Sequence, residues 1–270
     1  MTNTIADIET SDMILVTGSN TTENHPVLSS FVKRAVLKGK KLYVIDPRKV
    51  VLAEHADKWL RPTPGTDIAW INGLMHIIIK EDLQDKAFIE SRTENFEALK
   101  ETVEKYTPEY VENITGIKPD DLIEVARHFA KASAAAILYC MGITQHTCGT
   151  DNVKSLANLS LLCGHLGKPG GGVNPLRGQN NVQGACDMGG LPNVFTAYQP
   201  VSNDEARNNL EKVWNVTGMS ATPGIPVTEM IQKAYDKEMK SLYIIGENPL
   251  VSDPDLNHAR KALANLDFFV

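Results

Sequence analysis

Short apolar runs alternate with segments of helical periodicity along most of this 270-residue chain. The apolar runs lie at 13–17, 41–45, 134–140 and 241–246. Apolar residues recur at helical spacing in 27–37, 68–79, less regularly 86–106, then 119–132, 150–166, 228–237 and a last segment ending at 263. Strands that alternate with helices predict a parallel sheet with helices on both of its faces. The expected fold class is therefore α/β.

The first apolar run is followed by the stretch TGSNTTENHP. In open parallel sheets, ligands bind at the carboxyl ends of the strands. Gly18 permits close approach of a ligand to the backbone, and the helix start beside it suits a phosphate group. Asn20, Glu23 and Asn24 supply polar side chains there. A plain turn with a helix cap explains the same residues equally well, because Asn and Thr commonly cap helices.

Asp46 and Arg48 follow the second apolar run. An acidic residue after the second strand of such a unit commonly binds a ribose or a base. An arginine beside it is suited to pair with phosphate or to stack on a base. The dinucleotide fingerprint G-x-G-x-x-G is absent after the first run, so this motif does not by itself define the site.

The other two runs also end in polar or flexible residues. These are Met141 and Gln145 after 134–140, and Gly246, Glu247, Asn248 and Ser252 after 241–246. One such strand end would mean little. Four of them together indicate a large ligand with several phosphates and amide-rich heterocycles.

Residues 173–193 form a stretch rich in Asn, Gln and Gly that carries one arginine, Arg177. We expect a loop here, because the stretch is too polar for a core strand and too rich in glycine for a helix interior. Amides donate and accept in the same patch, which suits heterocycles such as pterins and guanines. Arg177 supplies a fork of donors suited to a carboxylate. An irregular buried loop held by its own amides is the alternative.

Composition excludes several classes of protein. The net charge is −6 and the basic residues are dispersed, which argues against nucleic-acid binding. No apolar run reaches the roughly 20 residues of a membrane segment, and no secretory signal opens the chain. The four cysteines lack metal-ligand spacing, and isolated cysteines fit a reducing, cytoplasmic setting. His25, His146 and His165 form no ligand motif, so we expect surface or capping residues.

Several motifs resemble the catalytic subunit of formate dehydrogenases in the molybdopterin oxidoreductase family. The most specific is GVNPLRGQNNVQGACDMGGLPNVFTAYQP, and the similarity continues through MGITQHTCGTDNVKSLANLSLLCGHLGKPGGG, GSNTTENHP, VIDPRK and IGENPL. The resemblance implies Rossmann-like parallel sheets in two partial domains, at 1–179 and 180–270. It also implies that an N-terminal iron–sulfur domain and a C-terminal barrel lie outside this chain. The chain alone is therefore expected to be inactive.

The family resemblance further implies two molybdopterin guanine dinucleotides around one molybdenum or tungsten, with a [4Fe–4S] cluster in the full-length subunit. Formate is the implied substrate, and electron-transfer subunits are the implied partners. Carried over by position, Arg177 holds formate and Gln179 lies beside the pterin. One dinucleotide is held by Gly18, Asn20, Glu23, Asn24, Asp46, Arg48, Gly65, Met141 and Gln145. The other is held by Gly246, Glu247, Asn248 and Ser252.

Two alternatives stay open at this point. One is another oxidoreductase of the same family, such as a nitrate reductase, although the Arg177 loop argues against it. The other is a non-catalytic nucleotide-binding module, since no metal ligand is identified in this chain.

Overall fold

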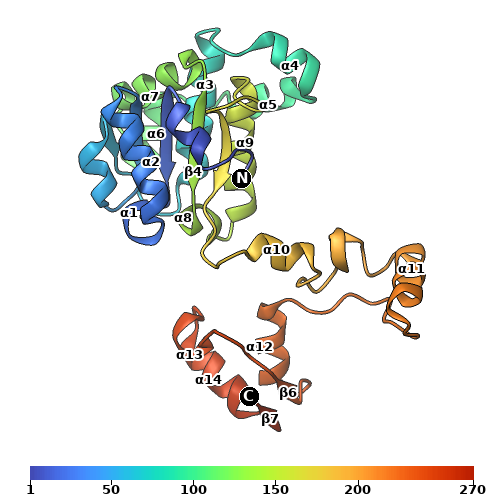
Figure 1. Cartoon of the computed structure of the whole chain (residues 1–270). Helices are drawn as coiled ribbons and strands as arrows, with labels where there is room; N and C mark the ends of the chain where they lie inside the picture. Colours follow the sequence, from blue (N-terminus) through green and yellow to red (C-terminus); the bar gives the residue numbers. More distant parts are fainter. The chain divides into compact units, whose positions relative to one another are not determined.

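A computed structural model describes residues 1–270 (Figure 1). The chain divides into two compact units, Met1–Gly178 and Gln179–Val270. We call them unit 1 and unit 2 and describe each by itself.

Unit 1 is built on a five-stranded sheet in which every neighbouring pair is parallel. The strands are β1 (Met13–Thr17), β2 (Lys41–Ile45), β3 (Lys58–Leu60), β4 (Ala135–Tyr139) and β5 (Gly172–Pro175), in the spatial order β3-β2-β1-β4-β5. The order reverses between β1 and β4, so the chain winds outward from the centre in both directions.

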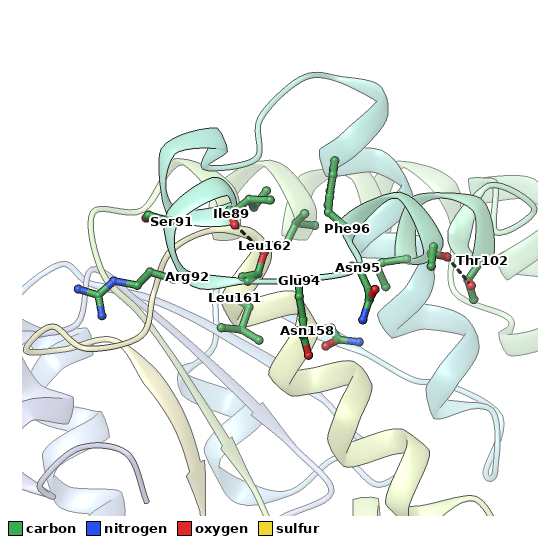
Figure 2. A pocket seen from close by; sticks show the side chains of 13 residues that line it. Ile89, Ser91, Arg92, Glu94, Asn95, Phe96, Thr102, Asn158, Leu161 and Leu162 are labelled. Atoms are coloured by element: carbon green, nitrogen blue, oxygen red, sulfur yellow. Dashed lines mark hydrogen bonds between the residues drawn. The ribbon is translucent and has the colours of Figure 1, made fainter.

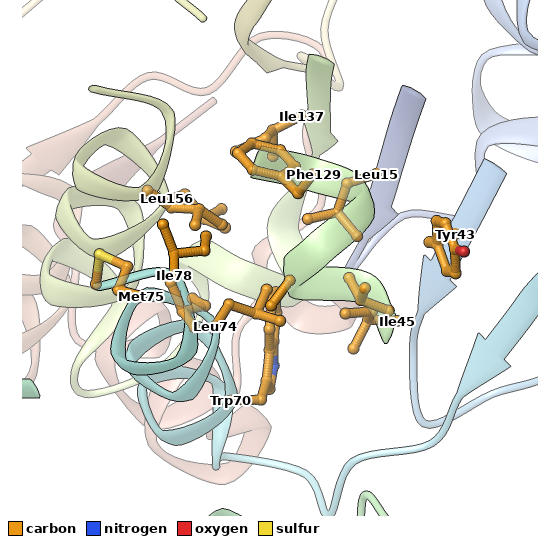
Figure 3. Close-up of a cluster of buried hydrophobic side chains, with 14 of the residues drawn as sticks. Leu15, Tyr43, Ile45, Trp70, Leu74, Met75, Ile78, Phe129, Ile137 and Leu156 are labelled. Carbon is orange, nitrogen blue, oxygen red and sulfur yellow. The ribbon is translucent and has the colours of Figure 1, made fainter. Parts of the chain in front are cut away.

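Both faces of this sheet are buried. Successive side chains of a strand point to opposite sides, so each strand contributes to two separate cores. Leu15, Ile45 and Ile137 face one core cluster, where they meet Trp70 and Phe129 (Figure 3). The residues next to them in the strands enter a second cluster on the opposite face. A strand buried on both sides reads as a continuous apolar run, which is the pattern that predicted β1, β2 and β4.

Helices cover both faces, which confirms the predicted α/β class. The first core cluster is closed mainly by α3 (Asp67–Lys80), α6 (Pro108–Thr115), α7 (Pro119–Lys131) and α9 (Gly149–Leu162). The second is closed by η1 (Ala6–Thr10), α2 (Pro26–Leu37) and η2 (Val51–His55). Proline opens α2, α6 and α7, where its missing N–H costs no helical hydrogen bond.

The segment 86–106, predicted with irregular helical periodicity, is two helices. These are α4 (Lys86–Arg92) and α5 (Phe96–Val103). Asn95 separates them with a φ of 59°, a left-handed conformation that no helix continues through. The sequence analysis missed α6, which is short and amphipathic.

The prediction of a loop over residues 173–193 is wrong at two places. Its first residues belong to β5, and Asn174 is fully buried there. Its Oδ1 atom accepts a hydrogen bond from the Asn3 backbone at 3.4 Å, while its Nδ2 atom is buried without a partner in the protein. Further along, α10 (Val182–Asp187) forms a short exposed helix. Local composition misled the prediction because the buried position depends on a partner distant in sequence.

Unit 2 contains short elements. They are α10, η3 (Thr196–Tyr198), α11 (Asp204–Trp214), α12 (Val227–Tyr235), β6 (Ser241–Leu242), α13 (Pro249–Ser252), α14 (Leu256–Ala264) and β7 (Phe268–Phe269). The strands β6 and β7 pair in parallel. The strand predicted over 241–246 is much shorter, because β6 has only two residues. A small core joins Ile231 and Ala234 of α12 to Ala262 and Leu263 of α14. In neither unit is a helix long and apolar enough to cross a membrane.

Candidate functional site

A pocket of about 460 Å³ opens at the carboxyl edge of the five-stranded sheet. Its walls are the segments that follow β1, β2, β3 and β4. The strand order reverses between β1 and β4, and this switch point is where open α/β sheets bind ligands. We call this cavity the switch-point pocket. Seven predicted residues line it: Gly18, Asn20, Asn24, Asp46, Arg48, Gly65 and Met141.

Glu23 and Gln145 were predicted beside these residues, and neither lines the pocket. Glu23 lies exposed in α1 (Thr21–Asn24), and Gln145 lies exposed at the end of α8 (Met141–Thr144). Their proposed contact with a cofactor remains a prediction.

Two glycines bring the ends of β1 and β4 into contact at the switch point. The Gly142 amide donates to the Gly18 carbonyl at 3.0 Å. A Cβ atom at Gly142 would lie 2.6 Å from the Gly18 Cα atom, and one at Gly18 would lie 2.7 Å from the Gly142 carbonyl carbon. Gly18 also has a φ of +55°. Only glycine at both positions permits this approach.

Asn20 decides between the two interpretations of the segment after β1. It occupies the position before α1, but its side chain makes no capping hydrogen bond. Its Oδ1 atom is buried and has no hydrogen-bond partner in the protein. A buried acceptor without a donor is costly, and such groups are rare in native structures. The helix-cap interpretation therefore fails for Asn20, and the side chain is left available for a ligand.

Asp46 is buried at the end of β2, with 8% of its surface exposed. Its Oδ1 atom accepts from the Arg48 amide at 2.8 Å, and its backbone carbonyl accepts from Trp59 Nε1 at 2.8 Å. Desolvation raises the pKa of this carboxyl above its usual value, although hydrogen bonds from the Arg48 and Ser19 amides oppose the shift. Asp46 is thus held in a fixed orientation beside the pocket.

Asp67 was not predicted as a site residue, and His146 was predicted to lie at the surface or in a cap. Both line the switch-point pocket. His146 Nε2 lies 2.9 Å from the Gly142 carbonyl and 3.6 Å from Asp67 Oδ2. Desolvation raises the pKa of Asp67, while a hydrogen bond from Trp70 and the charge of His146 oppose this. Asp67 opens α3, so its role could not be read from helical periodicity alone.

A third wall of the pocket, residues 62–65, was represented in the sequence analysis only by Gly65. It follows β3, which the sequence analysis missed because the strand has only three residues, one of them Lys58. The signal that remains visible is a proline-rich turn, PTPG, placed between a short apolar stretch and the start of α3.

Arg177 follows β5 and is exposed. The residue before it is hydrogen-bonded at both backbone groups, to the last residue of β4 and to Cys140, which follows it. The Leu176 amide donates to the Tyr139 carbonyl at 2.8 Å, and Cys140 Sγ donates to the Leu176 carbonyl at 3.0 Å. His25 Nε2 lies 2.7 Å from the carbonyl of Arg177 itself. Gln179 is the first residue of unit 2, and it is exposed.

Predicted residues of unit 2 form an exposed local cluster. Asn248 Oδ1 accepts from the Leu250 amide at 3.1 Å and caps α13. Ser252 Oγ lies within hydrogen-bond distance of Glu247 Oε1 at 3.2 Å and of the Asn248 carbonyl at 3.1 Å. Gly246 has a φ of +72°. Asn248 Oδ1 and Ser252 Oγ thus have partners within residues 247–252, whereas Oδ2 of the next residue, Asp253, is buried without a partner.

His165 contradicts the expectation of a surface or capping residue. It is 1% exposed, its Nε2 atom lies 2.8 Å from the Phe129 carbonyl, and burial lowers its pKa to about 4. The four cysteines are free thiols. No group of three or more His, Cys, Asp or Glu side chains in the chain could hold a metal ion.

A larger cavity, of about 940 Å³, lies between α4, α5 and α9 (Figure 2). None of the predicted residues lines it. Arg92, Glu94 and Asn158 contribute polar groups among leucine and phenylalanine side chains. The switch-point pocket is the better candidate because it combines two carboxyls whose pKa desolvation raises, Asp46 and Asp67, with an unpartnered acceptor, Asn20 Oδ1.

The strand order and the pocket at its reversal place unit 1 in the Rossmann-like class of α/β folds. The family model described as molybdopterin oxidoreductase matches residues 1–270, and the chain belongs to this family.

Two curated relatives illustrate the similarity. The chain is 52% identical over 270 residues to the F420-dependent formate dehydrogenase subunit alpha of Methanocaldococcus jannaschii, covering 100% of this chain and 40% of that protein. It is 44% identical over 270 residues to formate dehydrogenase H of Escherichia coli, covering 100% of this chain and 38% of that protein. This chain thus spans about two fifths of the length of these relatives.

A solved structure supports the fold. Acetylene hydratase from Pelobacter acetylenicus matches with a TM-score of 0.73 at 23% sequence identity, over 98% of this chain and 41% of that chain. At this identity the likeness concerns the arrangement of strands and helices.

Proposed function

We propose that this chain is the cofactor-binding centre of a formate dehydrogenase catalytic subunit, which oxidises formate to carbon dioxide. The observation that carries the proposal is the 52% identity to a formate dehydrogenase alpha subunit across every residue of the chain. The Arg177 segment supports formate as the substrate, because a guanidinium matches a carboxylate with two parallel hydrogen bonds.

The switch-point pocket fits one arm of a molybdopterin guanine dinucleotide. Its volume of about 460 Å³ lies within the range of small-molecule sites. Asn20 Oδ1 lacks a donor, and a nucleobase or ribose supplies one. Asp46 accepts from the same kinds of group, while Arg48 balances phosphate charge. The exposed cluster of Gly246, Glu247, Asn248 and Ser252 is assigned to the second dinucleotide.

A bound molybdenum or tungsten centre would supply the acceptor for the two electrons released when formate is oxidised to carbon dioxide. The residues of this chain bind and orient. Arg177 holds the formate carboxylate, Gln179 lies beside a pterin, and Met141 and Gln145 line the cofactor near the switch point. Glu23 and Asn24 complete the nucleotide end of that arm.

The iron–sulfur cluster does not fit this chain. A [4Fe–4S] cluster needs about four thiolate ligands held together, and no such group of side chains is present. We therefore place the cluster in a part of the subunit outside residues 1–270. The electron-transfer partners belong to the whole enzyme, and the free cysteines suit a cytoplasmic setting.

The test is Arg177→Lys in the complete enzyme that carries this chain. Lysine keeps the charge but loses the planar fork. We expect kcat/KM for formate to fall by about 10- to 100-fold, the effect of one lost charge-assisted hydrogen bond, with unchanged molybdopterin content. The control is Arg260→Lys, an exposed arginine of α14. An unchanged kcat/KM for formate in Arg177→Lys would reject formate binding by this residue and favour a different oxidoreductase or a non-catalytic module.

A further inference from the structure

The backbone of Arg177 is held by a side chain that arrives from the other end of unit 1. His25 Nε2 lies 2.7 Å from the Arg177 carbonyl oxygen, across 152 residues of sequence. We propose that His25 is a positioning residue that fixes Arg177 for its substrate. The inference rests on the proposed role of Arg177 as the carboxylate-binding arginine.

His25 is itself anchored where two helices meet. It ends α1 and precedes α2, and its φ and ψ of −135° and 60° belong to neither helix. Its amide donates to the Thr21 carbonyl at 3.0 Å, and its carbonyl accepts from the Ser29 amide at 2.9 Å. The imidazole therefore projects from a backbone that is hydrogen-bonded on both sides.

The chemistry of the contact fixes the tautomer. A backbone carbonyl only accepts, so the hydrogen of the ring must lie on Nε2, and in the neutral ring Nδ1 is an acceptor. Nδ1 is buried without a hydrogen-bond partner in the protein. The contact to Arg177 is thus the only hydrogen bond of the ring within the chain, so we expect its loss to act on Arg177 rather than on a wider network.

The segment that begins with Leu176 shows what His25 adds. Leu176 is bonded through its amide to Tyr139 in β4 and through its carbonyl to Cys140, the residue after β4. At the next residue, Arg177, the contact with His25 holds the backbone carbonyl, and unit 1 ends one residue later, at Gly178. His25 extends the rigid part of the backbone by one residue, to the residue that carries the guanidinium. Small displacements of a substrate-positioning group are costly in rate.

The contact also connects the two parts of the site. The segment from Gly18 to Asn24 contributes to the wall of the switch-point pocket, and His25 follows it directly. The segment that follows β1 therefore lines the cofactor pocket and holds the substrate arginine.

The experiment compares two amide substitutions in the holoenzyme. In His25→Gln the amide nitrogen can occupy the position of Nε2 and donate to Arg177, whereas in His25→Asn it matches Nδ1 and falls short. We expect KM for formate to rise about tenfold in His25→Asn and to stay within about threefold of wild type in His25→Gln. Bound nucleotide should be unchanged in both, and His55→Asn, at an exposed histidine, is the control.

Hydrogen exchange gives a readout that does not depend on turnover. Amides at 177–179 should exchange faster in His25→Asn than in His25→Gln, while those of β4 stay protected. Equal exchange and equal KM in the two variants would overturn the inference. So would a fall in stability that both variants share without a difference in KM.

A double variant separates this inference from the proposed function. If His25 acts through Arg177, His25→Asn should add little to the loss already caused by Arg177→Lys. Fully additive losses would overturn the positioning role. Arg177→Lys with normal formate kinetics would instead reject the proposed function, and faster exchange at 177–179 in His25→Asn would still support the contact.

Discussion

The candidate residues of the two units follow very different secondary structure and lie on cores of very different size. In unit 1, all five residues of β1 and all five of β4 are buried, and helices cover both faces of the sheet. In unit 2, β6 and β7 have two residues each, and the core joins two helices. Tyr243 and Ile245 remain 69% and 77% exposed beside β6.

This difference affects how firmly the candidate residues of each site are held. The switch-point pocket is formed by segments that leave a rigid sheet, and it keeps an unpartnered acceptor, Asn20 Oδ1, and a desolvated carboxyl, Asp46. The cluster around Asn248 is exposed at the start of α13, where Asn248 Oδ1 and Ser252 Oγ accept and donate hydrogen bonds within the same segment. We infer that the residues of the switch-point pocket are held more rigidly than those of the unit 2 cluster.

An isoleucine-to-alanine substitution in the core of each unit should give the largest difference between them. Ile137 in β4 is fully buried, and Ile231 in α12 is 8% exposed within a small cluster. Ile137→Ala should destabilise unit 1 by about 2–5 kcal/mol, and Ile231→Ala should cost less because its neighbours can collapse into the gap. Hydrogen exchange of β4 and α12 amides measures each effect locally. Equal losses would remove the distinction between the units.

Acid should affect unit 1 through His165. Its pKa is lowered from 6.5 to about 4 by burial, so the unfolded chain binds a proton in that range and the native protein does not. Stability is therefore lost as pH falls from about 6.5 towards 4, by up to about 3 kcal/mol. Thermal melting against pH measures the slope. It should flatten in His165→Gln, while the same change at the exposed His55 is the control, and an unaltered slope in His165→Gln would contradict the explanation.

Alanine substitutions at Gly142 in unit 1 and Gly246 in unit 2 separate the cost of a steric clash from the cost of backbone strain. A Cβ atom at Gly142 meets the Gly18 backbone at 2.6 Å, whereas one at Gly246 meets nothing within 4 Å. Gly142→Ala should separate the ends of β1 and β4 at a cost of about 1–3 kcal/mol. Gly246→Ala pays for its positive φ alone, about 1 kcal/mol. Melting temperatures of the two variants provide the comparison, and an effect of Gly246→Ala as large as that of Gly142→Ala would count against a close-packed switch point.

The smallest effect is expected from Asp46. Burial raises the native pKa of this carboxyl above 3.8, so its neutral form contributes stability at low pH that is lost as pH rises through the raised pKa. Asp46→Asn keeps an acceptor for the Arg48 amide without the charge. The difference in melting temperature, wild type minus Asp46→Asn, should therefore decrease as pH rises through the pKa of Asp46. The control is the matched substitution in unit 2, Glu247→Gln. A difference that rises with pH would show that Asp46 is stabilised as an anion.

The sequence predicted the parts of the fold that depend on local pattern. Strands β1, β2 and β4 were readable because residues buried on both faces form continuous apolar runs. Strand β5 was not readable, because Asn174 is a polar residue at a fully buried position, where its Oδ1 atom accepts from the Asn3 backbone at the opposite end of unit 1. Strand β3 was missed because Lys58–Leu60 is too short for a pattern.

The site shows the same division. Asp46 and Asn20 follow recognisable strands and could be predicted, and the pocket brings them together. Asp67 and the turn at 62–65 reach the same pocket after the unrecognised β3, so their place depends on sheet order rather than on neighbours in sequence. The contact of His25 with Arg177 spans 152 residues, and no local pattern encodes it.

The most direct test of the central claim measures the nucleotide that the switch-point pocket holds. GMP is released by acid from the complete purified enzyme and counted per subunit, in wild type, in Asp46→Ala and in Asp151→Ala, a control at an exposed residue of α9. If Asp46 binds one of two guanine dinucleotides, Asp46→Ala should lower GMP from about two towards one per subunit or below, while Asp151→Ala stays at about two. Full GMP occupancy in Asp46→Ala would contradict the assignment of this pocket.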